Sequence, residues 1–527
     1  MNRQAVQTLK TYFGYDTFRE GQESVVESIL EHRDVLAIMP TGAGKSICYQ
    51  VPALMLSGIT IVISPLISLM QDQVKALNEA GIHAAFINSS LSESQISKAL
   101  YLAAGGRYKI IYVAPERLEN YEFLEFARQV EISMVTVDEA HCISQWGQDF
   151  RPSYVKIVDF VKNLPGRPIV SAFTATATEE VKNDILCTLN LEDPKVVITG
   201  FDRKNLYYSV ENIRRKDDFV MDYIDRHPTE SGIIYCSTRK NVDNLFELLF
   251  QKGVAVTRYH AGLNNETRKK NQDDFIYDRT PVIIATNAFG MGIDKSNVRW
   301  VIHYNLPKSI ESFYQEIGRA GRDGLPSSTV LFYSLGDLIL LTKFASESNQ
   351  QSINLEKLQR MQQYAEADIC RRRILLSYFG ETTTEDCGNC DVCKSPPQRF
   401  DGTVIVQKAL SAIARTEQQI STGLLIDILR GNYSAEVTGK GYQELKTFGA
   451  GRDIPPRDWQ DYLLQMLQLG YFEIAYNENN HLKITASGSD ILFGRAKATL
   501  AVIRHEEVAT QKGKKKKVVV AKVLPFG

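Results

Sequence analysis

The segment MPTGAGKS, residues 39–46, contains the residue types that bind the phosphates of a nucleotide. Its glycines lack Cβ atoms, so backbone N–H groups at a helix N-terminus can surround a phosphate, while the lysine reaches the β and γ oxygens and the serine ligates Mg²⁺. Met39 stands where the GxxxxGK[ST] pattern has glycine. A GKS run also arises by chance in loops, but its position directly after the apolar run 35–39 favours phosphate binding. The predicted nucleotide contacts are Thr41, Gly42, Gly44, Lys45 and Ser46, with ATP and Mg²⁺ as the expected cofactors.

An acidic pair, Asp138 and Glu139, follows a second apolar run that begins at residue 134. Asp138 is expected to hold Mg²⁺ together with Ser46, and Glu139 to polarise the attacking water as a base. An acidic pair alone is typical of a solvated strand end. Combined with the loop at 39–46, it predicts a site of ATP hydrolysis.

Two arginines, Arg319 and Arg322, lie in the segment YQEIGRAGRDG, residues 314–324. The transition state of γ-phosphate transfer spreads negative charge, which a cation delivered from outside the phosphate loop can stabilise. Pairing with surface acids is the alternative for both arginines. In the context of the loop and the acidic pair, we expect them to act as arginine fingers.

Four of the eight cysteines cluster with gaps of 16, 2 and 2 residues between them. This spacing suits a tetrahedral Zn²⁺ site better than disulfides or buried free thiols. The predicted zinc ligands are Cys370, Cys387, Cys390 and Cys393, and the other four cysteines are expected to be small core residues.

Apolar, β-branched runs alternate with helix-like segments and must position these groups. Continuous apolar runs, in which apolar and polar residues do not alternate, are typical of parallel strands buried on both faces. They occur at 35–39, 59–64, 109–114, 134–140 and 168–176, and again at 232–236, 255–260, 281–286, 298–304 and 329–334. The pattern predicts two doubly wound α/β lobes joined near residues 197–208, with the active site in the cleft between them.

Length and charge limit the remaining possibilities. A chain of 527 residues is too long for one core, and its net charge of −1 means that nucleic acid would have to bind in local basic grooves. No apolar run is long enough to span a bilayer, and the N-terminus lacks the core of a secretory signal. We therefore expect no membrane association and a cytoplasmic location.

Short helices followed by a hairpin predict a winged helix after the cysteines. Residues 459–470 have helical spacing, and two strand-like runs over 471–485 flank the turn NENN. The basic tail QKGKKKK, 511–517, fits a nucleic-acid arm, a linker or a solvated charge run. The expected domains are a first lobe 1–202, a second lobe 203–340, a helical zinc-binding module 341–400, a winged-helix domain 401–505 and a basic tail 506–527.

The stretch DEAHCISQWGQDFRPSY, residues 138–154, places an aromatic and cationic cluster directly after the acidic pair. Aromatic side chains stack on bases without regard to sequence, at about 1–3 kcal/mol per base. A core role for Trp146 and Phe150 is the alternative, but the polar residues between them are unusual in a core strand. If this cluster contacts a strand, its direct connection to the acidic pair would let nucleic-acid binding shift Glu139 and its water.

Taken together, these segments resemble the RecQ-type DNA helicases of superfamily 2, over roughly the first 500 residues. The motifs that carry the resemblance are FGYDTFREGQ, MPTGAGKS, ISPLISLMQDQV, YVAPERL, DEAHCISQWGQDFRP, SAFTATAT, ATNAFGMGIDK and YQEIGRAGRDG, with the cysteine cluster. The resemblance implies RecA-like lobes and movement in the 3′ to 5′ direction on single-stranded DNA, with unwinding of duplexes in repair and recombination.

The same resemblance assigns further residues. Adenine recognition falls on Tyr15, Arg19 and Gln22, single-strand contacts on Trp146, Phe150 and Arg151, and sensing of ATP and DNA on Gly290 and Asp294. Ser64, Ser68 and Thr174 lie at predicted strand ends, where hydroxyls could meet DNA phosphates or cap helices.

The expected partners are single-stranded and forked duplex DNA, with a single-strand-binding protein as a further candidate, for a monomer acting at the nucleoid. The winged helix is expected to bind the duplex, and the chain after residue 505 offers no room for the HRDC domain of many relatives. A nucleotide-gated DNA-binding or strand-annealing module with little unwinding is the alternative function.

Overall fold

The computed structural model describes residues 2–147, 149–213, 215–289, 295–475, 478, 481–505 and 519–520. Gly290 and Asp294, the predicted sensor residues, lie outside these ranges, as do the basic run 511–517 and three residues of the turn 477–480. The chain forms two compact units, Met1–Met361 and Gln362–Gly527, and each is described by itself.

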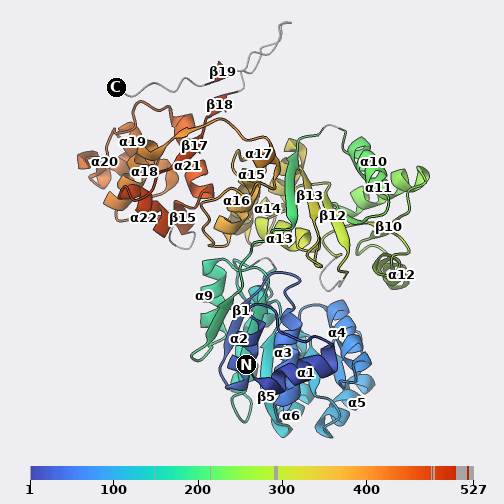
Figure 1. Ribbon diagram of the computed structural model, residues 1–527. Helices are drawn as coiled ribbons and strands as arrows, with labels where there is room; N and C mark the ends of the chain where they lie inside the picture. Colours follow the sequence, from blue (N-terminus) through green and yellow to red (C-terminus); the bar gives the residue numbers. More distant parts are fainter. Residues whose placement is uncertain are drawn as a thin grey trace. The chain divides into compact units, whose positions relative to one another are not determined.

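The first lobe contains a seven-stranded, all-parallel sheet in the order β3-β4-β2-β5-β6-β1-β7 (Figure 1). Its strands are β1 (Val35–Ile38), β2 (Ile59–Ile63), β3 (Ala84–Ile87), β4 (Ile110–Val113), β5 (Ile132–Val137), β6 (Ile169–Thr174) and β7 (Lys195–Ile198). Every residue of β1, β2, β4 and β6 is buried, as expected for strands covered on both faces. The prediction of a parallel sheet is confirmed.

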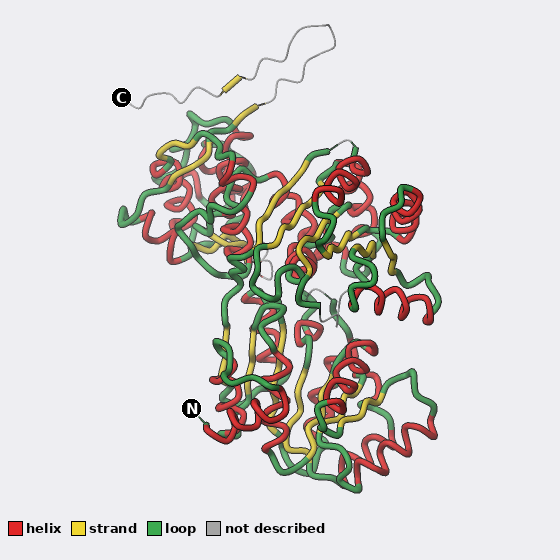
Figure 2. Tube along the Cα trace, turned by 45° about the vertical axis from the view of Figure 1, so that its right-hand side comes forward, coloured by secondary structure: helices red, strands yellow, loops and turns green. Residues whose placement is uncertain are grey.

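Helices alternate with these strands along the chain (Figure 2). They are α1 (Arg3–Phe13), α2 (Gln22–Leu30), α3 (Lys45–Met55), α4 (Ile67–Glu79), α5 (Glu93–Ala104), α6 (Tyr121–Gln129), α7 (Pro152–Val155), α8 (Ile157–Lys162) and α9 (Glu179–Thr188). Short 3₁₀ segments, η1 (Pro115–Arg117) and η2 (Ala140–Ile143), follow β4 and β5.

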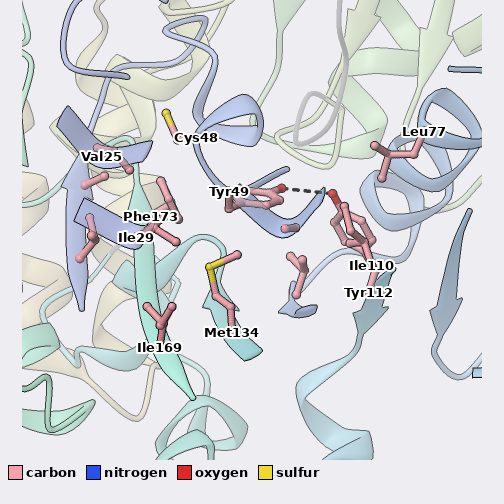
Figure 3. Close-up of a cluster of buried hydrophobic side chains, with 14 of the residues drawn as sticks. Val25, Ile29, Cys48, Tyr49, Leu77, Ile110, Tyr112, Met134, Ile169 and Phe173 are labelled. Atoms are coloured by element: carbon pink, nitrogen blue, oxygen red, sulfur yellow. Dashed lines mark hydrogen bonds between the residues drawn. The ribbon is translucent and has the colours of Figure 1, made fainter. Parts of the chain in front are cut away.

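A hydrogen bond inside the first core fixes α3, the helix that starts within the phosphate loop. The hydroxyls of Tyr49 on α3 and Tyr112 on β4 lie 3.2 Å apart among apolar side chains (Figure 3). Gln50 Nε2 donates to the same Tyr112 hydroxyl over 3.1 Å. Because buried polar groups are costly when unpaired, this pairing favours one orientation of α3 relative to the sheet.

The second lobe contains a six-stranded parallel sheet in the order β10-β11-β9-β12-β13-β8. Its strands are β8 (Leu206–Glu211), β9 (Ser231–Tyr235), β10 (Val256–Tyr259), β11 (Val282–Ala285), β12 (Val298–His303) and β13 (Ser327–Phe332). Its helices are α10 (Lys216–Arg226), α11 (Arg239–Gln251), α12 (Asn265–Ile276), α13 (Ile310–Ile317) and α14 (Leu335–Ser346). The chain passes from one sheet to the other between β7 and β8.

The second unit begins within α15 (Gln351–Glu366) and contains helices and three antiparallel strand pairs, β14 with β17, β15 with β16, and β18 with β19. Its helices are α16 (Arg371–Tyr378), α17 (Asp391–Lys394), α18 (Thr403–Arg415), α19 (Thr422–Arg430), α20 (Ala435–Gly439), η3 (Tyr442–Glu444), α21 (Pro456–Gln468) and α22 (Ala486–Leu492). Its paired strands are β14 (Arg399–Asp401), β15 (Phe472–Ala475), β16 (His481–Ile484) and β17 (Thr499–Ala501), with β18 (Arg504–His505) against β19 (Val519–Val520). The predicted helix and hairpin correspond to α21 and to β15 with β16.

Candidate active site and metal centre

The phosphate loop connects β1 to α3, and two glycines give it its shape. Gly42 and Gly44 have φ values of 87° and 79°, a left-handed conformation that glycine adopts without strain. Lys45 Nζ donates to the Met39 carbonyl over 3.1 Å. Met39 itself has no positive φ, its N–H bonds to Thr174 O, and its side chain is buried, so the backbone at this position does not require glycine.

The acidic pair follows β5 in a strained turn. Glu139 has a φ of 48°, which is unusual for a residue with a side chain and costs about 1–2 kcal/mol. Asp138 is buried, and its Oδ1 accepts a hydrogen bond from the Glu139 N–H over 3.0 Å. Burial, and then the neighbouring Glu139 carboxylate, raise the pKa of Asp138 to about 7. Burial also lowers the pKa of Lys45, against the attraction of both acids.

The imidazole of His141 connects the acidic pair to the first lobe's sheet. Its Nδ1 lies 2.9 Å from Thr174 Oγ1 and 3.3 Å from Glu139 Oε2. Burial lowers the pKa of His141, so the ring is neutral near pH 7. Within the described part of the chain, Glu139 Oε2 is buried and forms no hydrogen bond. One carboxylate oxygen of the pair is therefore left for a ligand or water.

Tyr154, grouped by sequence with the aromatic cluster, supports the acidic pair instead. It is fully buried, and its hydroxyl donates to the Asp138 carbonyl over 2.9 Å. It therefore cannot stack on a base in this structure.

The two predicted finger residues, Arg319 and Arg322, follow α13, and Arg322 lies against the phosphate loop. A Cβ placed on Gly42 would lie 3.3 Å from Arg322 Cγ, and one on Gly318 would lie 3.2 Å from Thr41 Cβ. Burial is the main cause of the lowered pKa of Lys45, and the two acids oppose it. The positive charge of Arg322 lowers this pKa further, by a smaller amount. Arg319 is 5% exposed. The structure therefore brings the predicted loop and the predicted arginine segment together.

Arg203, which sequence reasoning missed, holds this junction together. Its Nη1 donates to Thr41 O over 3.3 Å and to Gly318 O over 3.2 Å. Its Nη2 donates to Ala320 O over 2.8 Å and to Gly321 O over 3.0 Å. One guanidinium thus joins the phosphate loop to the turn that carries Arg319. An arginine in an inter-lobe connection has no pattern that would have revealed this role.

The segment predicted to recognise adenine packs on the phosphate loop. Tyr15 is 51% exposed and accessible for stacking. Arg19 Nη1 donates to Gly42 O over 2.7 Å. The Gln22 side chain is 4% exposed, its Nε2 donates to Ala43 O over 2.9 Å, and its Oε1 accepts from the Arg19 N–H. In this structure the Gln22 amide therefore contacts the loop itself.

The aromatic loop packs directly on the residues that follow the acidic pair. A Cβ on Gly147 would lie 1.9 Å from His141 O, so only glycine fits there. Trp146 and Phe150 are half-buried. Arg151 donates to Pro65 O over 2.9 Å and pairs with Asp149. The loop therefore lies in backbone contact with the turn that follows the acidic pair.

Two hydroxyls predicted to meet DNA are inaccessible in this structure. Ser64 and Thr174 are fully buried at the ends of β2 and β6, and Thr174 Oγ1 donates to Thr176 O over 3.1 Å. A direct phosphate contact by Ser64 or Thr174 would therefore require these side chains to become exposed. Ser68, on the first turn of α4, is exposed as the prediction requires.

The four clustered cysteines converge on one point in the second unit. Their sulfur atoms all lie within 4.8 Å of one another, and Cys387 Sγ and Cys393 Sγ are 3.8 Å apart. Four sulfurs placed about 2.3 Å from one zinc ion in a tetrahedron are about 3.8 Å apart. Backbone N–H groups of Cys387 and Cys393 point at the sulfurs of Cys370 and Cys390 over 3.3 and 3.4 Å. Hydrogen bonds from Cys387 and Cys390 lower the pKa of Cys370, which favours the thiolate that a metal binds.

Cys370 lies at a break between two helices. Helix α15 ends at Glu366, and Cys370 is the N-cap of α16. This break turns the cysteine towards the CxxCxxC segment.

Four family profiles match consecutive parts of the chain. They are the DEAD/DEAH box helicase (residues 19–184), the helicase conserved C-terminal domain (215–324), the RecQ zinc-binding module (335–394) and the RQC domain (396–509). The matches confirm the predicted ATP-binding helicase lobes and zinc-binding module.

The chain is similar to the ATP-dependent DNA helicase RecQ of Haemophilus influenzae, with 42% identity over 96% of this chain and 82% of the relative. The same-named protein of Bacillus subtilis is 41% identical over 96% of this chain and 86% of the relative. No described helix is long and apolar enough to cross a membrane.

Two solved structures share the fold at low identity. Dbp5 of S. cerevisiae bound to RNA and ADP BeF3 has a TM-score of 0.53 and 18% identity, covering 68% of this chain and 98% of that one. The DUF1998 helicase MrfA bound to DNA has a TM-score of 0.54 and 17% identity, covering 71% and 54%. With the phosphate loop, acidic pair, arginine segment and cysteine cluster in place, and with this identity to bacterial relatives along almost its whole length, the chain belongs to the RecQ family of helicases.

Proposed function

We propose that this protein hydrolyses ATP between its two lobes and uses the cycle to move 3′ to 5′ along single-stranded DNA and to unwind duplexes. The observation that carries the proposal is that Arg322 of the second lobe lies against Gly42 of the first lobe's phosphate loop, while Arg203 bonds to both sides of the junction. Opening and closing of such a junction is a means of linking hydrolysis to movement.

Ser46 and Asp138 would hold Mg²⁺, whose bound charge would neutralise the phosphates. The donor set fits this ion, because a hydroxyl and a carboxylate are the oxygen ligands that Mg²⁺ prefers. The raised pKa of Asp138 reflects burial near Glu139, and a nearby cation favours the ionised carboxylate that a metal ligand requires.

Glu139 would accept the proton of the attacking water through its buried Oε2, the oxygen without a hydrogen bond among the described residues. The strained φ of Glu139 and the His141 imidazole, 3.3 Å away, hold that carboxylate in place. Lys45 would bind the β and γ phosphates, and Arg319 and Arg322 would stabilise the charge that develops on the γ-phosphate. Tyr15, Arg19 and Gln22 would position the adenine, with Gln22 keeping its contact to the loop.

Trp146 and Phe150 would stack on bases, while Arg151 and Ser68 would contact the strand or its phosphates. The backbone contact between Gly147 and His141 is a short connection from the DNA contacts to Glu139. In the second unit, the hairpin of β15 and β16 would contact duplex DNA.

We further propose that the domains of the chain meet at residues 202, 340, 400 and 505. The protein would act as a monomer in the cytoplasm, at the nucleoid, with a single-strand-binding protein as a partner.

A strand-displacement assay tests the proposal. Duplexes with a 3′ tail, a 5′ tail or no tail are incubated with the protein and either ATP or a non-hydrolysable analogue. We expect the protein to separate the strands of the 3′-tailed duplex when ATP is present and not when the analogue replaces it. Equal separation with the analogue, or hydrolysis without separation of any substrate, would instead support a nucleotide-gated binding or annealing module. The variant Lys45→Ala is the matched control for hydrolysis at this site.

A further inference from the structure

Lys357 of α15 reaches the backbone of the aromatic loop in the first lobe. Its Nζ donates to the carbonyls of Trp146 and Gly147, each over 2.7 Å. An ammonium group bonding two adjacent carbonyls fixes the path of the backbone, and charge-assisted hydrogen bonds are stronger than neutral ones. The middle of the loop is therefore held from outside the first lobe.

The two ends of the loop are anchored separately within the first lobe. At one end, Ser144 Oγ donates to Asp184 of α9 over 2.6 Å. At the other, Arg151 donates to Pro65 O over 2.9 Å. Lys357 thus contacts the loop between these two anchors, from a helix that follows the second lobe in the chain.

The same ammonium group pairs with a second-lobe helix. Lys357 Nζ lies 3.5 Å from Oε1 of Glu311, and the two side chains are 13% and 6% exposed. Glu311 is in the first turn of α13, and Arg319 and Arg322 follow the other end of that eight-residue helix. A pair this buried is weakly screened by salt and holds its geometry.

We infer that Lys357 is a positioning residue that ties the aromatic loop to α13, so that displacement of the loop by DNA is transmitted to the arginine segment at the end of that helix. The inference rests on the proposed function, because it requires DNA to bind at the loop. It adds a second connection to the one through Gly147 and His141: the first leads to Glu139, and the second leads to the arginines.

The test compares ATP hydrolysis with and without single-stranded DNA in four variants. Lys357→Met keeps the apolar stem and removes the charge, whereas Lys357→Arg keeps the charge. The double variant Lys357→Met/Glu311→Gln removes both charges, so that no buried carboxylate is left without its cation. Lys343→Met is the matched control, because Lys343 lies on α14 and is 69% exposed.

We expect Lys357→Met and the double variant to lower the DNA-stimulated kcat by about tenfold, within the range typical of coupling between sites. The affinity for a fluorescent oligothymidylate should change far less than the stimulated rate, because Lys357 does not contact DNA. Lys357→Arg should recover most of the stimulation, and Lys343→Met should match the wild type. A purely structural role would not produce this split between affinity and rate or this rescue.

Wild-type stimulation in folded Lys357→Met would overturn the inference and leave the proposed function intact. If Lys357→Met does not fold, the double variant decides, and its retention of full stimulation would overturn the inference equally. A wild-type protein whose ATPase activity does not respond to DNA would overturn both the inference and the proposed function.

Discussion

Replacing Arg203 with alanine should slow ATP hydrolysis without weakening ATP binding to a similar extent. The side chain donates to one carbonyl of the phosphate loop and to three carbonyls of the turn that carries the arginines. It touches none of the predicted phosphate-binding side chains through these bonds, so its removal would leave the loop's own contacts to the nucleotide in place. What it removes is the geometry that delivers Arg319 and Arg322.

The size of the effect follows from how sensitive such delivery is. An arginine finger contributes about 10³–10⁵-fold to kcat, and a misplacement of about 1 Å costs about 100-fold. We therefore expect Arg203→Ala to lower kcat by about 100-fold, which corresponds to about 2.7 kcal/mol of transition-state stabilisation. Arg203→Lys should recover part of the loss, because a lysine has three donors on one atom and cannot reach all four carbonyls.

Steady-state ATPase kinetics with saturating DNA measure both parameters. Arg215→Ala is the matched control, since that side chain is 86% exposed and its Nη1 lies 3.6 Å from Asp218 Oδ2 in the same helix turn. A kcat for Arg203→Ala within threefold of the wild type would refute the reasoning. So would a loss expressed mainly in KM, because it would mean that Arg203 acts on binding of the ground state.

Asp138→Asn should raise the midpoint of thermal unfolding more at pH 8 than at pH 5, measured without nucleotide or Mg²⁺. Asp138 has a pKa of about 7 in the folded protein against an ordinary 3.8, so the wild type loses stability as the pH rises from about 4 to 7 and the asparagine variant does not. An equal difference in unfolding midpoint between variant and wild type at pH 5 and pH 8 would contradict this. Trp146→Ala should lower DNA stimulation of ATP hydrolysis by about tenfold, as loss of about 1–3 kcal/mol of stacking implies, whereas Tyr101→Ala, at an aromatic side chain 80% exposed on α5, should not. Metal analysis should find about one zinc ion per chain, lost in Cys390→Ser and retained in Cys187→Ser, whose exposed thiol lies outside the cluster; pure, active protein without zinc would remove the metal site.

The sequence pattern located the central strands but missed β3 and β7 at the two edges of the first sheet and β8 at one edge of the second. Strands β3 and β7 pair on one side only, and β7 leaves Val196 and Ile198 37% and 46% exposed. Short edge strands lack the continuous apolar run on which the prediction relied. The central strands, in contrast, are apolar on both faces and coincide with the predicted runs to within three residues at either end.

The phosphate loop, acidic pair and cysteines were predictable because their chemistry requires particular residues at short spacing. The role of Tyr154 was not predictable, because an aromatic residue at the end of this stretch has the same sequence signature whether it faces solvent or supports Asp138. Arg203 and Lys357 could not be found at all. Each donates to backbone carbonyls more than 100 residues away, and a carbonyl leaves no trace in the sequence.

The position of β1 has a consequence for how the chain is made. It is the first strand of the lobe to leave the ribosome, whereas its two neighbours in the sheet, β6 and β7, are the last strands of the lobe to do so. At about 5–20 residues per second, roughly 7–27 seconds of synthesis separate the start of β1 from the start of β6. During that interval an apolar strand has both edges unpaired and is prone to self-association. Newly synthesised chains therefore depend on rapid local collapse, or on a chaperone, until the partners emerge.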